Sequence, residues 1–170
     1  MLDCIVCNYF KMKDNRGEFH KPFEIDFIPD KNFQLEECFY SESDKNVVRG
    51  MHYQSQPYAH NKIVFVTNGK ILDVVLCIDK DNKNYGKFSS IELSESNGKS
   101  LYIPVGYAHG FLSLEDNTKV VYLTDKKYDK LHDRGILWSS FGFNWPTGNP
   151  IISDRDKTHD RFLDVKEAFK

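Results

Sequence analysis

The stretch Lys62-Ile-Val-Phe-Val-Thr67, Asn68-Gly69, Lys70-Ile-Leu-Asp-Val-Val-Leu-Cys-Ile78 decides the fold class. Its two apolar runs are rich in β-branched residues, which favour strands. They are separated by Asn-Gly, which can supply the two positive-φ positions of a type I′ turn. We therefore expect two antiparallel strands joined as a hairpin.

Further short apolar runs flank this stretch, and each is followed by a turn signal. They are Phe88–Leu93, Leu101–Ile103, Gly110–Leu114 and Lys119–Thr124. Turn signals that recur every 8–12 residues or so favour an antiparallel sandwich or barrel. A first strand is expected near Asp3–Phe10, before a turn at Asp14–Gly17.

Only the end of the chain has a helical pattern. Thr158 is expected to cap a helix that places Phe162, Val165 and Phe169 on one face. The sequence thus predicts an all-β jelly-roll barrel with a short C-terminal helix.

Length and composition indicate one globular domain over residues 1–170. The chain has 40% hydrophobic and 28% charged residues, and its net charge is −2. Because there is no basic excess, nucleic-acid binding through phosphate contacts is not expected. No apolar run approaches a membrane span, and Asp3 stands where a signal peptide carries Lys or Arg. We expect a cytoplasmic protein with no membrane or nucleic-acid partner.

The four cysteines do not form a metal-binding pattern. Cys4 and Cys7 make a single C-x-x-C, and no second pair completes a zinc site. Free cytosolic thiols are the expected state.

One constellation carries chemistry. The spacing Gly98-x5-Pro104-x-Gly106-x2-His109 is similar to the second cupin motif, with Ser113 in place of its usual Asn. The first cupin motif requires His-x-His, but Arg49-Gly-Met-His-Tyr-Gln54 has one histidine. Three strong ligands are therefore not supplied locally, although His60 could join His52 and His109. We expect no metal and no cofactor, and histidines that act as acids or bases.

Five segments together resemble the dTDP-4-dehydrorhamnose 3,5-epimerase family. They are Val48–Gln54, Asn61–Val64, Ile103–Leu112, Val121–Thr124 and Ile152–Asp156, and their order and spacing agree over about residues 3–156. The resemblance implies a cofactor-independent cupin, usually a homodimer. It also implies epimerisation of a nucleotide-diphospho-4-keto-6-deoxy sugar at carbons beside the ketone.

The resemblance assigns four catalytic residues. A proton beside a ketone is removable only if the enolate is stabilised, and inversion requires a base and an acid on opposite faces. His52 matches the family's base, and Asp156 would orient its ring as in a triad. Tyr122 matches the acid, and Lys62 matches the cation beside the ketone oxygen, where a preorganised donor is worth roughly 3–4 kcal/mol.

The resemblance also assigns substrate-binding residues. Arg49 and His109 match residues that contact the sugar and assist at the oxyanion. The residues matched to the nucleotide and diphosphate are Arg16, Tyr128, Asp133 and Arg155. Tyr128 would stack on the base, and the arginine forks suit phosphate oxygens.

The backbone at Gly50 is expected to be irregular. On a regular strand Arg49 and His52 point to opposite faces. A bulge at Gly50 would let both serve one site.

Two departures from the family pattern lie at the nucleotide end. Lys21 replaces a glutamate, and Glu37-Cys-Phe39 replaces a Gln-Asp-Asn-type stretch. We therefore expect the reaction type to be kept while the nucleotide or sugar differs, as in relatives that act on GDP-linked 4-keto heptoses for surface polysaccharides. The alternatives are a dTDP-4-dehydrorhamnose 3,5-epimerase proper, a metal-dependent cupin oxygenase or isomerase, and a non-catalytic sugar-binding cupin.

Overall fold

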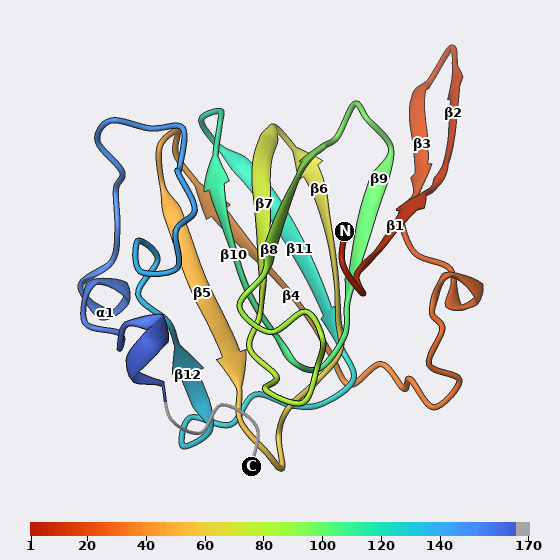
Figure 1. The fold of residues 1–170 in the computed structure, drawn as a ribbon. Helices are drawn as coiled ribbons and strands as arrows, with labels where there is room; N and C mark the ends of the chain where they lie inside the picture. The colour runs from red at the N-terminus through yellow and green to blue at the C-terminus, as the bar shows by residue number, and fades with distance from the viewer. Residues whose placement is uncertain (166–170) are drawn as a thin grey trace.

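The protein forms two five-stranded antiparallel sheets that face each other in a barrel (Figure 1). This computed structural model describes residues 1–165. The first sheet has the order β1 (Ile5–Asn8), β9 (Lys99–Ile103), β6 (Lys62–Asn68), β11 (Thr118–Thr124), β4 (Glu37–Ser43). The second has the order β12 (Asp133–Gly135), β5 (Val48–Gln54), β10 (Tyr107–Ser113), β7 (Lys70–Cys77), β8 (Phe88–Ser94). The jelly-roll barrel expected from the sequence is confirmed.

Alternation along the strands produces an inner core and two outer ones. Val64 and Val66 of β6 point inward with Phe111 of β10, and the intervening Phe65 packs outside. The segment around Phe33 covers the outer face of the first sheet. Residues 136–145 cover the outer face of the second sheet, where Trp145 is buried. Both sheets thus bury apolar side chains on both of their faces.

The predicted hairpin at Asn68-Gly69 is wrong. The two strands exist, but β6 and β7 belong to different sheets. Gly69 has φ +77°, and a Cβ there would collide with Thr118. Asn68 is not in the left-handed region. The Asn-Gly pair therefore turns the chain from one sheet to the other, where β6 lies between β9 and β11 and β7 lies between β10 and β8.

A separate hairpin extends from the barrel near the N-terminus (Figure 1). It consists of β2 (Phe10–Asp14) and β3 (Gly17–Lys21), with the predicted turn at Asp14–Gly17. Tyr9 and the preceding β1 anchor it to the edge of the first sheet. The expected first strand is thus split into β1 and β2.

The predicted short C-terminal helix is confirmed, but its position and its N-terminal cap differ from the expected ones. The helix α1 (Asp154–Lys157) is shorter and earlier than expected, because the Ser153 hydroxyl caps it at the N-terminus. Thr158 is its C-cap. Phe162 begins a 3-10 turn, η2 (Phe162–Asp164), and Phe169 lies outside the described residues. A further 3-10 turn, η1 (Ile25–Phe27), precedes β4.

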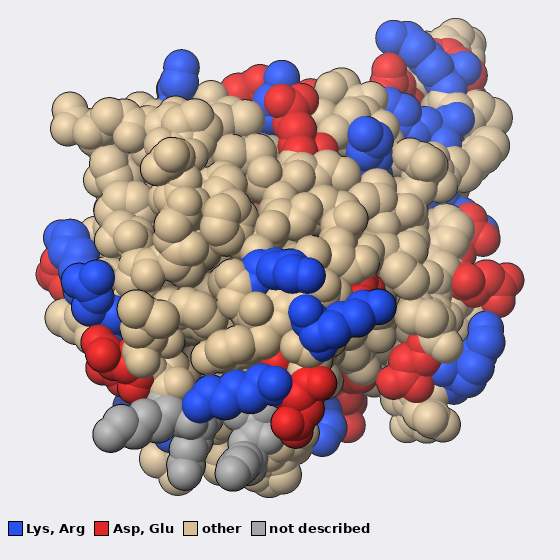
Figure 2. Space-filling model, viewed as in Figure 1, with Lys and Arg blue, Asp and Glu red and all other residues tan. Residues whose placement is uncertain are grey.

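Charges on the visible face are mixed in sign. Figure 2 shows Lys and Arg beside Asp and Glu, with no extended basic patch on this face. No helix among the described residues has the length and apolarity needed to cross a bilayer. The four cysteines are free, as expected.

Candidate active site

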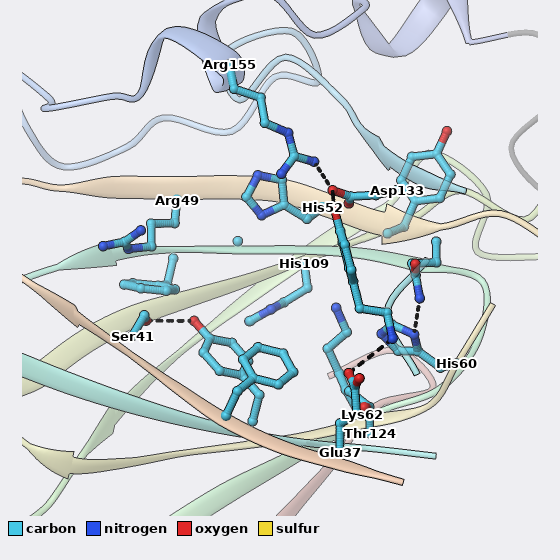
Figure 3. Close-up of a pocket in the computed structure, with 17 residues that line it drawn as sticks. Glu37, Ser41, Arg49, His52, His60, Lys62, His109, Thr124, Asp133 and Arg155 are labelled. Atoms are coloured by element: carbon cyan, nitrogen blue, oxygen red, sulfur yellow. Dashed lines mark hydrogen bonds and ion pairs between the residues drawn. The ribbon is translucent and has the colours of Figure 1, made fainter. Parts of the chain in front are cut away.

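A pocket of about 270 Å³ opens between the two sheets (Figure 3). One wall comes from β5, β10 and β12, and the other from β4, β6 and β11. The predicted residues that line it are Arg49, His52, Lys62, His109, Tyr122, Tyr128, Asp133 and Arg155. The fold therefore brings together residues that span more than 100 positions of the sequence.

A bulge in β5 allows Arg49 and His52 to face the same pocket. His109 pairs with His52 and Phe111 pairs with Arg49, so β5 holds one more residue than β10 in this interval. The extra residue is at Gly50, where φ is +135°. A Cβ at Gly50 would lie 2.5 Å from the Gly110 Cα. The predicted irregularity at Gly50 is confirmed.

His52 and Asp156 form a hydrogen-bonded pair at the pocket wall. The His52 Nε2 donates to Asp156 Oδ1 at 2.8 Å, and the Gly50 amide donates to Oδ2 at 3.1 Å. Burial lowers the pKa of His52 despite the neighbouring carboxylate. The imidazole is thus neutral at pH 7, and its Nδ1 is the nitrogen that can accept a proton.

Asp156 is held as a buried carboxylate by α1. Its side chain is 5% exposed. Burial opposes its charge, but the close His159 imidazole and the hydrogen bonds from His52 and the Gly50 amide together bring its pKa far below the usual range. A permanently charged Asp156 fixes the tautomer and orientation of the His52 ring, as the aspartate of a triad does.

Tyr122 lies on the opposite sheet from His52. Its hydroxyl is 3.2 Å from the Ser41 hydroxyl. The Phe39 ring stacks on the Tyr122 ring, with 4.9 Å between the ring centroids. Burial raises the pKa of Tyr122 well above the ordinary value of a phenol. The hydroxyl is therefore protonated at neutral pH and can donate a proton. Sequence reasoning did not find Ser41, because a strand serine gives no signal.

Lys62 brings a cation to the same interior. Burial lowers its pKa to about 8, although Asp73 and Asp133 oppose this shift. Figure 3 shows its side chain directed into the pocket between the two walls. Lys62 is thus mostly charged at pH 7 in a poorly hydrated place, where a charge acts strongly.

A second His–Asp pair lies deeper in the barrel. The His109 Nε2 donates to Asp73 Oδ2 at 2.7 Å, and both side chains are buried. Sequence reasoning missed Asp73. The available signal was that Asp73 is the single charged residue in the apolar run 71–78.

The remaining predicted residues gather at the pocket mouth. Arg155 pairs with Asp133 at 2.7 Å, and the Tyr128 hydroxyl donates to Asp133 at 3.2 Å. Glu37 accepts from the Tyr128 amide at 3.1 Å and also lines the pocket. This end therefore combines an aromatic ring, a guanidinium and two carboxylates.

Arg16 is not part of this pocket. It lies in the turn between β2 and β3, and its guanidinium pairs with Asp14 at 2.6 Å. Its side chain is 80% exposed. The structure therefore does not bring Arg16 to the other predicted residues within one chain.

The three histidines considered as metal ligands do not form a cluster. In residues 1–165, the one group of three ligand-type side chains within reach of each other is His52, Asp156 and His159. His60 instead meets Gln54, whose amide donates to its Nδ1 at 3.1 Å.

The sequence matches a known family over nearly its whole length. The family model described as dTDP-4-dehydrorhamnose 3,5-epimerase matches residues 1–164. The chain belongs to the dTDP-4-dehydrorhamnose 3,5-epimerase family. It is accordingly an isomerase that acts on a sugar nucleotide.

Individual relatives agree with this family assignment. The chain is 38% identical to the dTDP-4-dehydrorhamnose 3,5-epimerase of Shigella flexneri over 165 residues, which cover 89% of this chain and 87% of that protein. The crystal structure of the Sulfolobus tokodaii epimerase is 37% identical, has a TM-score of 0.89, and aligns over 98% of this chain and 94% of that one. The Legionella pneumophila epimerase, solved with dTDP-4-keto-L-rhamnose, is 26% identical with a TM-score of 0.88, over 95% and 89% of the two chains.

These comparisons favour one of the alternatives kept open by the sequence. The three relatives are epimerases of the dTDP-linked type. The expected resemblance to enzymes of GDP-linked heptoses finds no support in them. The hypothesis of a dTDP-4-dehydrorhamnose 3,5-epimerase is therefore better supported than the hypothesis of an enzyme for GDP-linked heptoses.

Proposed function

We propose that this epimerase inverts C3, C5 or both of a dTDP-linked 4-keto-6-deoxy sugar, in the cytoplasm and for surface polysaccharide synthesis. The observation that supports it is that His52 and Tyr122 line one pocket from opposite sheets. A sugar ring between them would have a base on one face and an acid on the other, as inversion requires. The dTDP-linked ligand of the Legionella enzyme supports the choice of substrate.

The chemistry follows from the protonation states of these groups. Neutral His52 removes the proton from the carbon beside the ketone, and the C–H electron pair becomes the enolate. The developing negative charge on the ketone oxygen is stabilised by Lys62, with Arg49 as a further donor, and His109, whose Nε2–H is bound to Asp73, lines the pocket beside the sugar. Tyr122 then donates its hydroxyl proton to the opposite face of the carbon, and the resulting phenolate regains a proton from water. Asp156 stabilises the imidazolium that forms on His52, which then releases the abstracted proton to solvent and is neutral again for the next turnover.

Proton exchange with solvent tests this proposal. Incubation of dTDP-4-keto-6-deoxyglucose with the protein in D2O should place deuterium at C3, C5 or both, as followed by proton NMR. His52→Ala should lower exchange by about 100-fold or more, because it removes the base. Tyr122→Phe should retain some exchange while net inversion stops.

The control is His60→Ala, because His60 lines the pocket but has Gln54 as its partner. It should keep most of the exchange. Exchange that survives His52→Ala would refute the assignment of the base, and a wild-type protein without any exchange would favour a sugar-binding cupin.

A GDP-linked substrate is the second candidate, and Glu37 is the observation that favours it. Its carboxylate lines the mouth beside Tyr128. A carboxylate can accept two hydrogen bonds from the adjacent N–H groups of guanine, whereas thymine offers it one N–H donor. Calorimetric titration with dTDP and GDP, on the wild type and on Glu37→Gln, distinguishes the two. If the wild type binds GDP more tightly than dTDP and Glu37→Gln abolishes this preference, the result supports recognition of guanine by Glu37. Tighter binding of dTDP by the wild type would exclude a GDP-linked substrate.

We also propose that the protein is a homodimer that uses the β2–β3 hairpin. Phe10, Met12 and Phe19 share one face of the hairpin, because Met12 pairs with Phe19. Each of these side chains is 47–54% exposed. An apolar stripe on a projecting ribbon is suited to cover by a second copy. Such a contact could carry Arg16 toward a substrate on the partner.

A further inference from the structure

We propose that His159 is a positioning residue of the epimerase, a second imidazole that contacts the carboxylate of Asp156 at the same oxygen as His52. The inference rests on the proposed function, because it assigns His52 as the base. His159 was not among the residues expected to form the site. Its signal in the sequence is its place three residues after Asp156.

His159 contacts Asp156 through its Nε2 atom, which has no other partner among residues 1–165. The His159 Nε2 lies 3.4 Å from Asp156 Oδ1, the same oxygen that accepts from His52. That nitrogen is buried and has no ideal hydrogen bond to any residue in 1–165. The rings of His52 and His159 lie 5.7 Å apart and nearly perpendicular. The carboxylate is thus enclosed by two imidazoles.

The fold makes room for this ring at a specific glycine. Gly135 of β12 pairs directly with His52 of β5. A Cβ at Gly135 would collide with the His159 imidazole, whose ring atoms are its three nearest neighbours. After His159, Asp160 forms a bridge with Ile136, which fixes the segment against β12. A glycine next to the catalytic histidine therefore seats the second histidine.

The electrostatic consequence has one sign whatever the charge of His159. A neutral His159 that donates to Asp156 weakens the carboxylate as an acceptor for His52, and a protonated His159 repels the imidazolium of His52. Both lower the proton affinity of His52, which keeps the base free at neutral pH. The other charged groups that act on His52 are Arg155 of the helix α1 and Lys62 of β6, and Asp133 of β12 pairs with Arg155.

A matched pair of variants separates positioning from packing. His159→Gln keeps an N–H donor near the position of Nε2, and His159→Met fills similar space without one. For His159→Met we expect kcat to fall about tenfold, less than the loss of the base itself, with KM nearly unchanged. The acid limb of its pH profile should move to higher pH, because His52 gains proton affinity. His159→Gln should keep both kcat and the acid limb of the pH profile close to their wild-type values.

Gly135→Ala tests the position of the His159 ring by a substitution in β12. Alone it should reproduce the His159→Met phenotype, because its methyl group displaces the imidazole. In the double variant Gly135→Ala/His159→Ala, the glycine substitution should add little to the loss of His159→Ala alone, since the side chain that would collide with the new methyl group is gone. Additive losses would overturn the inference, as would equal losses in His159→Met and His159→Gln with an unmoved acid limb.

The inference can fail independently of the proposed function. An NMR titration of the His52 imidazole needs no substrate and reports its pKa directly. His159→Met should raise that pKa and His159→Gln should not. An unchanged His52 pKa in folded His159→Met protein overturns the role of His159, whereas a shifted pKa in a protein without exchange activity overturns the proposed function alone.

Discussion

At the scale of single residues, the pocket holds charges where the barrel interior disfavours them. Lys62 is the clearest case, because burial brings its pKa down to about 8. Such a cation is unfavourable for folding and useful for an enolate oxygen. Function and stability are thus opposed at this position.

Lys62→Met should therefore lose activity and gain stability. We expect kcat to fall about 100-fold or more, and the thermal midpoint to rise, because a desolvated charge is removed. Steady-state kinetics and thermal unfolding at pH 7 measure the two effects. Lys70→Met is the control, since Lys70 pairs at the surface with Glu92. A Lys62→Met enzyme with wild-type kcat would exclude Lys62 from oxyanion stabilisation.

The activity of the wild type should also depend on the charge of Lys62. The folded pKa of about 8 lies below the ordinary value of 10.5. The cation is present below pH 8 and is lost as the pH rises through it, so kcat should decline above about pH 8. A pH–rate profile measures this basic limb. A rate that stays constant from pH 7 to 10 would contradict the prediction.

At the scale of elements, the bulge in β5 decides which side chains meet. It moves Arg49 and His52 to the same face, and it needs a residue without a side chain at Gly50. The left-handed backbone there and the close Gly110 both exclude Cβ. The site depends on this local irregularity as much as on the strands.

Gly50→Ala should destabilise the protein and misplace His52. The strained backbone and the collision with Gly110 should cost about 2–4 kcal/mol of unfolding free energy. Urea unfolding measures this, and exchange kinetics report the misplaced base. Gly148→Ala is the matched control, because a Cβ there meets nothing within 4 Å. Similar unfolding free energies in the two variants would show that the bulge tolerates a side chain.

At the scale of the whole molecule, the hairpin β2–β3 leaves apolar side chains outside the barrel. The ring centroids of Phe10 and Phe19 lie 6.4 Å apart, and both side chains are about half exposed. The single-domain organisation stays a prediction, for which one cooperative unfolding transition is the expected observation.

Phe10→Ser/Phe19→Ser should shift the protein from dimer to monomer. The substitutions remove the apolar stripe of the hairpin and leave the barrel core unchanged. Sedimentation equilibrium measures the mass over a range of concentrations. Leu131→Ser is the control, because Leu131 is also exposed but lies away from the hairpin. A dimer that persists in the double variant would place the interface elsewhere.

The sequence by itself determined the strands, the barrel class and most of the pocket. Period-2 apolar runs and turn residues are local signals, so they could be located without coordinates. The bulge was also predictable, because Arg49 and His52 could serve one pocket only if Gly50 interrupted the alternation. The motif spacing indicated the family, and the family match bears this out.

Only the tertiary structure decided which strands pair and which groups support the catalytic ones. The local pattern at Asn68-Gly69 predicts a hairpin, but β6 and β7 lie in different sheets and pair with strands distant in the sequence. Asp73 meets His109, and His159 meets Asp156, through contacts between elements that no local pattern encodes. The physical reason is that pairing and burial are set by the sum of long-range contacts, whereas a sequence pattern reports only its own neighbourhood.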